Sequence, residues 1–113
     1  MKKFTEETSL CGIIVYEIKE NGCLNGLYTN NDPNRQVMNQ IAKKFKEDKS
    51  NDILGMYTTA WIEGDNEIRN GTLEIKPERN EIYSLEEIVE SKILYKGSGF
   101  KFGNLLVATY WKI

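Results

Sequence analysis

Three side chains in the segment GMYTTAWI could form one surface of a ligand-binding site. Tyr57, Thr59 and Trp61 recur at every second position, so in a β-strand all three point to the same face. Aromatic rings combined with a hydroxyl group give the mixed apolar and hydrogen-bonding surface that lines small-molecule pockets. We therefore predict that this strand face contributes to a ligand site.

Aromatic residues later in the chain could complete the same surface if the strands close into a barrel. The candidate ligand-binding residues are Tyr57, Thr59, Trp61, Tyr83, Tyr95 and Trp111, with Tyr16 and Phe100 as further aromatic side chains that could converge on them. The interior of an eight-stranded barrel is wide enough either to be filled by side chains or to hold one small ligand. Two interpretations therefore stand: a filled aromatic core, or a pocket for an apolar or aromatic molecule.

Catalysis has little support in the residue types. The chain has no histidine, which excludes every triad or general-base scheme that uses imidazole. A carboxylate could still do acid-base chemistry if it faced inward, and the candidates are Glu17, Glu63, Glu86 and Glu87. Charged residues on strands also serve simply to prevent aggregation, and nothing in this spacing requires more. We predict a protein without catalytic residues.

No motif for a cofactor or a metal is complete. The glycines of KGSGFKFG lead into a strand rather than a helix, so the helix N-terminus that would hold a dinucleotide phosphate is missing. Cys11 and Cys23 leave a zinc site short of ligands, and residues 63–67 lack the ligand spacing of a calcium loop. We predict no cofactor and no metal, and we expect both cysteines to be buried free thiols.

The first half of the chain predicts a hairpin followed by a helix. Residues 12–19 are rich in β-branched side chains, and Asn21-Gly22 predicts a two-residue turn that places Cys23 opposite Glu20 and leads to a strand at 24–29. Asp32 then suits an N-cap before Pro33, and an amphipathic helix is expected over 33–49. Its apolar face would comprise Val37, Met38, Ile41, Ala42 and Phe45 and would pack on the β structure.

The second half predicts an antiparallel meander of short strands separated by turn-prone clusters. Residues 84–94 fit either a short helix, because Ser84 and Glu87 form a capping-box pattern, or two strands with a turn near Glu90-Ser91. We favour the strands. The last strand is apolar on both faces, which predicts a covering element. The expected helix is available for that role, or it could instead cap one end of the barrel.

The stretch 70–111 resembles a family of small bacterial β proteins that carry a GTLTI strand, a Y-x-L strand, a Y-x-G-x-G turn and a GN-x-L-V-x-x-Y strand. The matching positions are Gly71, Thr72, Leu73, Ile75, Tyr83, Leu85, Tyr95, Gly97, Gly99, Gly103, Asn104, Leu106 and Tyr110. The resemblance implies a calycin-like barrel, similar to avidins or lipocalins, and it brings no catalytic residues. Glu87 stands where this family tends to place an aromatic residue.

Length and charge bound the remaining possibilities. The chain of 113 residues suits one domain, 1–113, and its net charge of −2 offers no positive field for nucleic acid. No apolar run is long enough for a signal peptide or a membrane span, so we expect a cytoplasmic protein without membrane partners. The sequence leaves a homo-oligomer open. It favours a non-catalytic barrel that binds a small apolar or aromatic molecule; the alternative is a protein-interaction or self-association module with a filled core.

Overall fold

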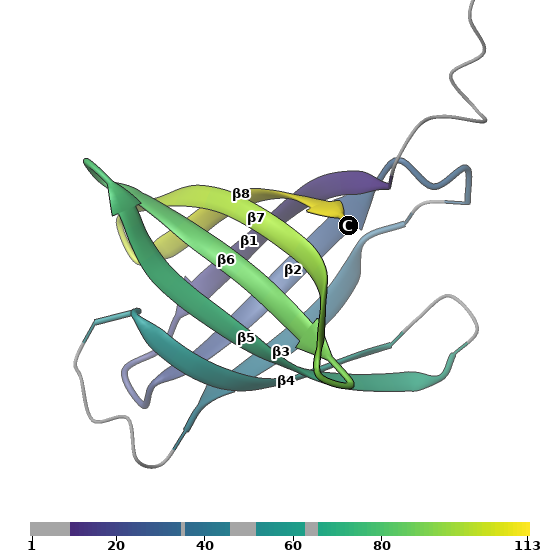
Figure 1. Ribbon diagram of the computed structural model, residues 1–113, viewed down its shortest axis with the longest axis horizontal. Helices are drawn as coiled ribbons and strands as arrows, with labels where there is room; N and C mark the ends of the chain where they lie inside the picture. Colours follow the sequence, from purple (N-terminus) through teal and green to yellow (C-terminus); the bar gives the residue numbers. More distant parts are fainter. Residues whose placement is uncertain (1–9, 35, 46–51, 63–65) are drawn as a thin grey trace, which may run out of the picture.

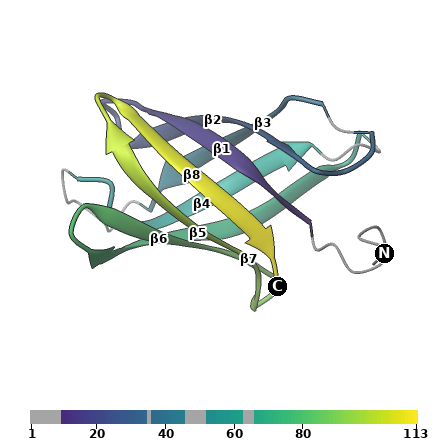
Figure 2. The same ribbon diagram turned by 90° about the horizontal axis from the view of Figure 1, so that it is seen from above.

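The chain forms a closed antiparallel β-barrel of eight strands. The computed structural model describes residues 10–34, 36–45, 52–62 and 66–113. The strands are β1 (Cys11–Ile18), β2 (Cys23–Asn30), β3 (Met38–Lys44), β4 (Gly55–Ile62), β5 (Ile68–Arg79), β6 (Ile82–Val89), β7 (Lys92–Phe102) and β8 (Leu105–Lys112). Each strand pairs with the next, and β8 pairs with β1, so the sheet has no free edge along its length (Figures 1 and 2).

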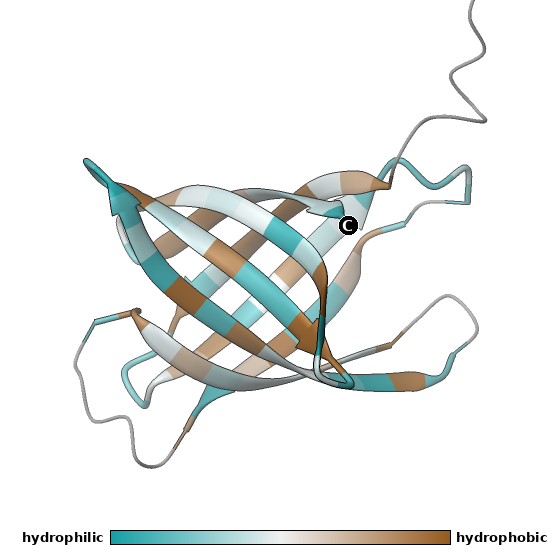
Figure 3. Cartoon of the chain, in the orientation of Figure 1, coloured by the Kyte–Doolittle hydropathy of each residue, from teal (hydrophilic) through white to brown (hydrophobic). Residues whose placement is uncertain are grey.

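Alternation along the strands determines which side chains face the interior. In Figure 3, hydrophobic and hydrophilic residues follow one another along most strands, as expected for a sheet with one buried face. The buried hydrophobic residues include Tyr16, Leu24, Tyr57, Leu73, Ile75 and Leu106. Close packing of these side chains forms the core of the barrel.

The two ends of the barrel differ. At one end, which we call the filled end, short turns connect β1 to β2, β5 to β6 and β7 to β8. At the other, which we call the open end, β2 leads to β3 and β6 leads to β7, and Lys112 N donates a hydrogen bond to Leu10 O (2.9 Å). The first and last described segments therefore meet at the open end.

The helix expected over 33–49 is wrong for every described residue in that range. Residues 38–44 form β3, which bonds to β2 on one side and β4 on the other; residues 35 and 46–49 lie outside the described chain. A helix here would leave the backbone groups of both neighbouring strands unpaired, which is costly in a buried sheet. Asp32 accepts a hydrogen bond from Asn34 N (2.8 Å) within a turn rather than capping a helix.

In the strand, the residues of the expected apolar helix face no longer share one side. Ala42 faces the interior and is fully buried, whereas Val37 and Ile41 are 69% and 53% exposed. The predicted cover for the last strand is therefore absent from the described chain, and the outward-facing Trp111 of β8 is 40% exposed. The outer face of β8 contacts solvent.

The strand interpretation of residues 84–94 is confirmed. β6 and β7 are joined at Glu90-Ser91, and both residues have positive φ (51° and 68°), as a tight hairpin turn of this type requires. The first hairpin differs from expectation by one residue. Lys19 N donates to Cys23 O (2.9 Å), so Cys23 lies opposite Lys19 and not Glu20, with Gly22 at φ 81° in the loop.

Both cysteines are free thiols, but the expectation that they are buried is wrong: Cys11 is exposed and Cys23 is half-buried. In the described ranges, no helix has the length and apolar character needed to cross a membrane.

Candidate functional site

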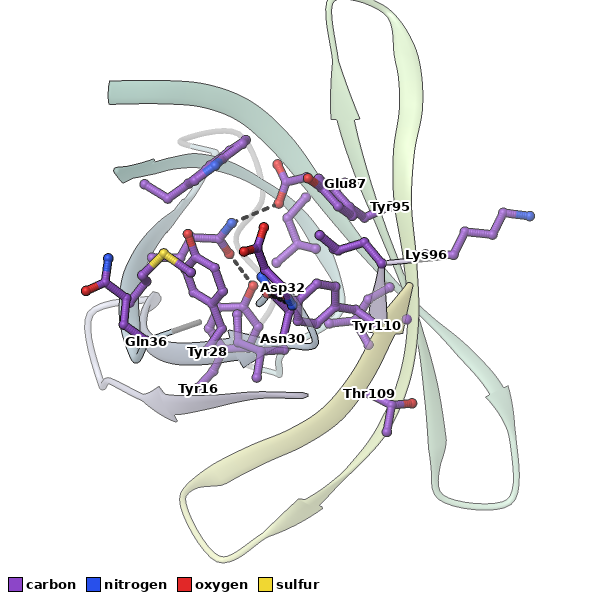
Figure 4. Close-up of a pocket in the computed structure, with 18 of the residues that line it drawn as sticks. Tyr16, Tyr28, Asn30, Asp32, Gln36, Glu87, Tyr95, Lys96, Thr109 and Tyr110 are labelled. Atoms are coloured by element: carbon purple, nitrogen blue, oxygen red, sulfur yellow. Dashed lines mark hydrogen bonds between the residues drawn. The ribbon is translucent and has the colours of Figure 1, made fainter. Parts of the chain in front are cut away.

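A cavity of about 360 Å³ occupies the interior toward the open end of the barrel. Its lining comes from all eight strands, and the aromatic and acidic lining residues on them include Tyr16, Tyr28, Trp61, Glu87, Tyr95 and Tyr110 (Figure 4). The segment between β2 and β3 contributes a polar rim through Asp32, Asn34 and Gln36. The barrel is therefore hollow over part of its length.

The filled end closes the bottom of this cavity. Leu73 and Leu85 line its lower wall and are only 2% and 5% exposed. Beyond them, Leu24, Tyr57 and Leu106 are packed with 2% exposure or less. Tyr57 also donates its hydroxyl proton to Ile53 O (2.8 Å), which fixes its ring in the core. Among the described residues, the cavity lining reaches the surface at the rim of the open end, where a ligand can enter.

A hydrogen-bonded polar network crosses the cavity wall between four strands. Thr59 Oγ1 on β4 donates to Glu87 Oε2 on β6 (2.6 Å), and Gln40 Nε2 on β3 donates to Glu87 Oε1 (3.2 Å). The hydroxyl of Tyr16 on β1 donates to Gln40 Oε1. Gln40, Thr59 and Glu87 are the buried polar side chains of the described barrel. Each is thus held by partners rather than left unsatisfied.

Two glycines make room for this network. A Cβ atom at Gly71 would lie 2.6 Å from Glu87 Oε2, so only glycine at this position of β5 accommodates the carboxyl group. A Cβ atom at Gly26 would lie 2.8 Å from the ring of Tyr16. The absence of side chains at these two inward positions lets Glu87 and Tyr16 lie flat against the wall.

Burial changes the acid-base behaviour of both groups. Glu87 is 7% exposed, and this burial raises the pKa of its carboxyl group to about 7, although the hydrogen bonds from Thr59 and Gln40 lower it. Burial, followed by the nearby charge of Glu87, raises the pKa of the Tyr16 hydroxyl. Tyr16 therefore remains a proton donor to Gln40, and Glu87 changes charge near neutral pH.

An aromatic wall formed by Tyr28, Tyr95 and Tyr110 is held by ring contacts. Tyr110 on β8 contacts Tyr28 with centroids 6.3 Å apart and Tyr95 with centroids 5.9 Å apart, both edge to face. The Tyr110 hydroxyl donates to Thr29 O (3.3 Å). These contacts preorganise one apolar side of the cavity.

The structure brings together some of the sequence-predicted site residues and separates the others. Trp61 and Tyr95 line the cavity, and Thr59 reaches it through its bond to Glu87. Tyr57 lies deeper, in the filled end, and Tyr83 packs against the core below the cavity. Trp111 faces outward on β8.

Of the three candidate carboxylates that the structure describes, only Glu87 is brought into the cavity. Glu86 faces outward and pairs with Lys76 (3.3 Å), and Glu17 pairs with Lys19 on the surface (2.9 Å). Glu63 lies outside the described residues. Within the described ranges, no group of three or more cysteine, aspartate or glutamate side chains is placed to hold a metal ion.

Sequence reasoning missed Gln40, Tyr28 and Tyr110 as cavity residues. The helix expected over 33–49 includes Gln40, although Met38, Gln40 and Ala42 also alternate as strand residues do. The same alternation relates Leu85 to Glu87 and would have placed this carboxyl group inside.

Comparisons of the chain with protein-family models, with curated proteins and with solved structures found no match.

Proposed function

We propose that this protein is a non-catalytic, small-molecule-binding β-barrel that holds an apolar or aromatic ligand in the open end. The observation that carries the proposal is the cavity of about 360 Å³, walled by aromatic rings and containing one buried carboxyl group. Small-molecule sites begin at about 300 Å³ and combine an apolar lining with a few fixed polar groups. The cavity fits this description in both size and chemistry.

The energetic cost of the polar network supports a binding role. Burying a carboxyl group is unfavourable, and an apolar residue at Glu87 would fit a purely structural barrel better. Instead, Thr59, Gln40 and Tyr16 hold Glu87 in place beside the cavity. A group held in this way is suited to orient a ligand.

The chain offers an internal probe for the test. It has two tryptophans: Trp61 lines the cavity, and Trp111 faces outward. In a Trp111→Phe variant, fluorescence would report on Trp61 alone. We expect neutral aromatic molecules such as 2-phenylethanol to change its emission in a saturable way.

The matched control is Trp61→Phe, which retains Trp111 as the sole tryptophan. Its emission should not change over the same ligand concentrations, because Trp111 lies outside the cavity. Absence of a saturable change in the Trp111→Phe variant, together with native mass spectra that show no retained small molecule, would contradict the proposal.

We infer self-association as the second candidate function, because an apolar row crosses the outside of the barrel. The row consists of cross-strand neighbours on four adjacent strands: Leu27 of β2, Val15 of β1, Val107 of β8 and Phe100 of β7. Leu27 and Phe100 are 56% and 53% exposed. Exposed apolar patches favour contact with another protein surface. Light scattering during size-exclusion chromatography tests self-association. A dimer that Leu27→Ser converts to a monomer would support it, and an unmodified protein that is monomeric at all concentrations would contradict it.

The calycin-like relationship and a cytoplasmic location belong to the same proposal. The closed order of eight antiparallel strands supports the former, and the free thiols of Cys11 and Cys23 support the latter.

A further inference from the structure

We propose that the ligand of the cavity is a small organic cation, an amine with an aromatic or alkyl body, whose ammonium group binds the carboxylate of Glu87. This inference depends on the proposed binding function and adds the chemical class of the ligand. It follows from three features of the cavity: its uncompensated acidic charge, the geometry of Glu87 and the aromatic wall.

The first feature is charge. The groups that face Glu87 from the neighbouring strands are Gln40 of β3, Thr59 of β4, Gly71 and Leu73 of β5 and Tyr95 of β7, and none of them carries a positive charge. Tyr16, Tyr28 and Tyr110 line the remaining wall.

The cations nearest the open end are engaged or directed elsewhere. Arg69, on the inward face of β5 nearer the open end, places its guanidinium group 3.7 Å from the Glu67 carboxylate, and its side chain is 38% exposed. Lys96 borders the cavity, but its side chain extends away from the other labelled residues in Figure 4. On the rim, Asp32 adds a second carboxyl group. Among the described lining residues the interior therefore carries acidic charge without a basic partner, which favours a cationic ligand and repels an anionic one.

The second feature is the geometry of the carboxyl group. An ionised carboxylate has about four acceptor positions, and the hydrogen bonds from Thr59 and Gln40 use one on each oxygen of Glu87. Capacity for another donor remains on each oxygen. Tyr16 in turn orients Gln40 by donating to its amide oxygen, which directs the amide nitrogen toward Glu87. Glu87 is thus fixed to accept a charge-assisted hydrogen bond from a ligand.

The third feature is the aromatic wall. Trp61, Tyr28, Tyr95 and Tyr110 line the same cavity as Glu87. Ring faces attract an ammonium group within about 6 Å, and this attraction increases when water is excluded. The same rings would pack against the body of an aromatic amine. Carboxylate and rings together select for a molecule that has both a cationic end and an apolar end.

Binding of this kind must depend on pH. Because burial raises the pKa of Glu87 to about 7, its ionised fraction falls from about nine-tenths at pH 8 to about one-tenth at pH 6. A cation binds the ionised form, so its affinity should be about tenfold weaker at pH 6 than at pH 8. An alkylamine keeps its charge over this range, as lysine does.

The test compares 2-phenylethylamine with 2-phenylethanol, which has the same body and a neutral hydroxyl in place of the ammonium group. Isothermal titration at pH 8 should show the amine binding about tenfold more tightly than the alcohol, and only the amine should weaken at pH 6. Glu87→Gln should abolish both the preference and the pH dependence while alcohol binding continues. Glu86→Gln, on the outer face of the same strand, should behave as the unmodified protein.

The outcomes separate this inference from the proposed function. If the alcohol binds as tightly as the amine, or if amine binding does not weaken at pH 6, the cationic ligand is wrong and the binding function stands. If neither molecule binds, both proposals fail. The pH comparison uses the unmodified protein, so it decides the matter even if Glu87→Gln does not fold.

Discussion

The two ends of the barrel are built from the same eight strands and the same alternation, yet one is solid and the other hollow. In the filled end, inward positions carry Leu24, Ala42 and Leu106, which exclude solvent without any polar atom in the side chain. Toward the open end they carry Gln40 and Glu87, a bonded polar pair that borders the cavity. The filled end therefore supplies stability, and the open end is suited to recognition.

Leucine truncations should measure this difference directly and should give the largest effects. Leu24 is 1% exposed in the filled end, whereas Leu73 is 2% exposed but borders the cavity. Leu24→Ala should lower the unfolding free energy by about 4 kcal/mol and Leu73→Ala by about 2 kcal/mol, both within the usual range for buried leucine. The second value is smaller because the Leu73 side chain borders the cavity and contacts fewer neighbouring atoms. Urea unfolding provides both values. Equal costs would mean that the two ends are packed alike.

The charge state of Glu87 should give the next largest effect. Folding raises its pKa from 4.5 to about 7, so the folded state binds more protons between these values and stability is lost as the pH rises through 7. The full loss is on the order of 3 kcal/mol. Glu87→Gln should therefore match the unmodified protein near pH 4.5 and exceed it by about this amount at pH 8.

Urea unfolding of both proteins over this pH range isolates the contribution of Glu87, because the other carboxylates titrate in both. A constant difference between the two proteins from pH 4.5 to 8 would show that Glu87 is solvated in the folded state.

Substitution on the outside of β3 should have the smallest effect. Ile41 belongs to the apolar face of the helix expected from the sequence, but in the barrel it is 53% exposed. Ile41→Ala should change the unfolding free energy by no more than about 0.5 kcal/mol. A cost near 3 kcal/mol in thermal or urea unfolding would instead indicate that this side chain is buried.

Local patterns predicted most strands and failed at β3 for a definite reason. Residues 84–94 fit two structures locally, and only the resemblance of 70–111 to a family of β proteins favoured the strands. The structure joins these strands by a turn in which Glu90 and Ser91 have positive φ. At 37–45 the apolar positions fit a helix by their spacing, and the alternation of Met38, Gln40 and Ala42 fits a strand equally well. Only the need to pair β2 and β4 decides between them, and that need is not local in sequence.

The candidate site could be predicted only in part for the same reason. Alternation on β4 correctly placed Trp61 and Thr59 on one inward face, but it could not separate them by depth from Tyr57. The Gln40 and Glu87 side chains meet across 47 residues of sequence, and closure of the barrel creates that contact.

The central claim is that a small molecule binds inside the open end, and a two-dimensional amide NMR titration with 2-phenylethylamine at pH 8 tests it most directly. The account predicts saturable shifts at the indole of Trp61 and the amides of Gln40, Glu87 and Tyr95, which surround the cavity. The indole of Trp111 and the amide of Leu24, outside it and below it, should remain unchanged. No shifts at all, or shifts confined to the outer row around Leu27 and Phe100, would contradict the claim.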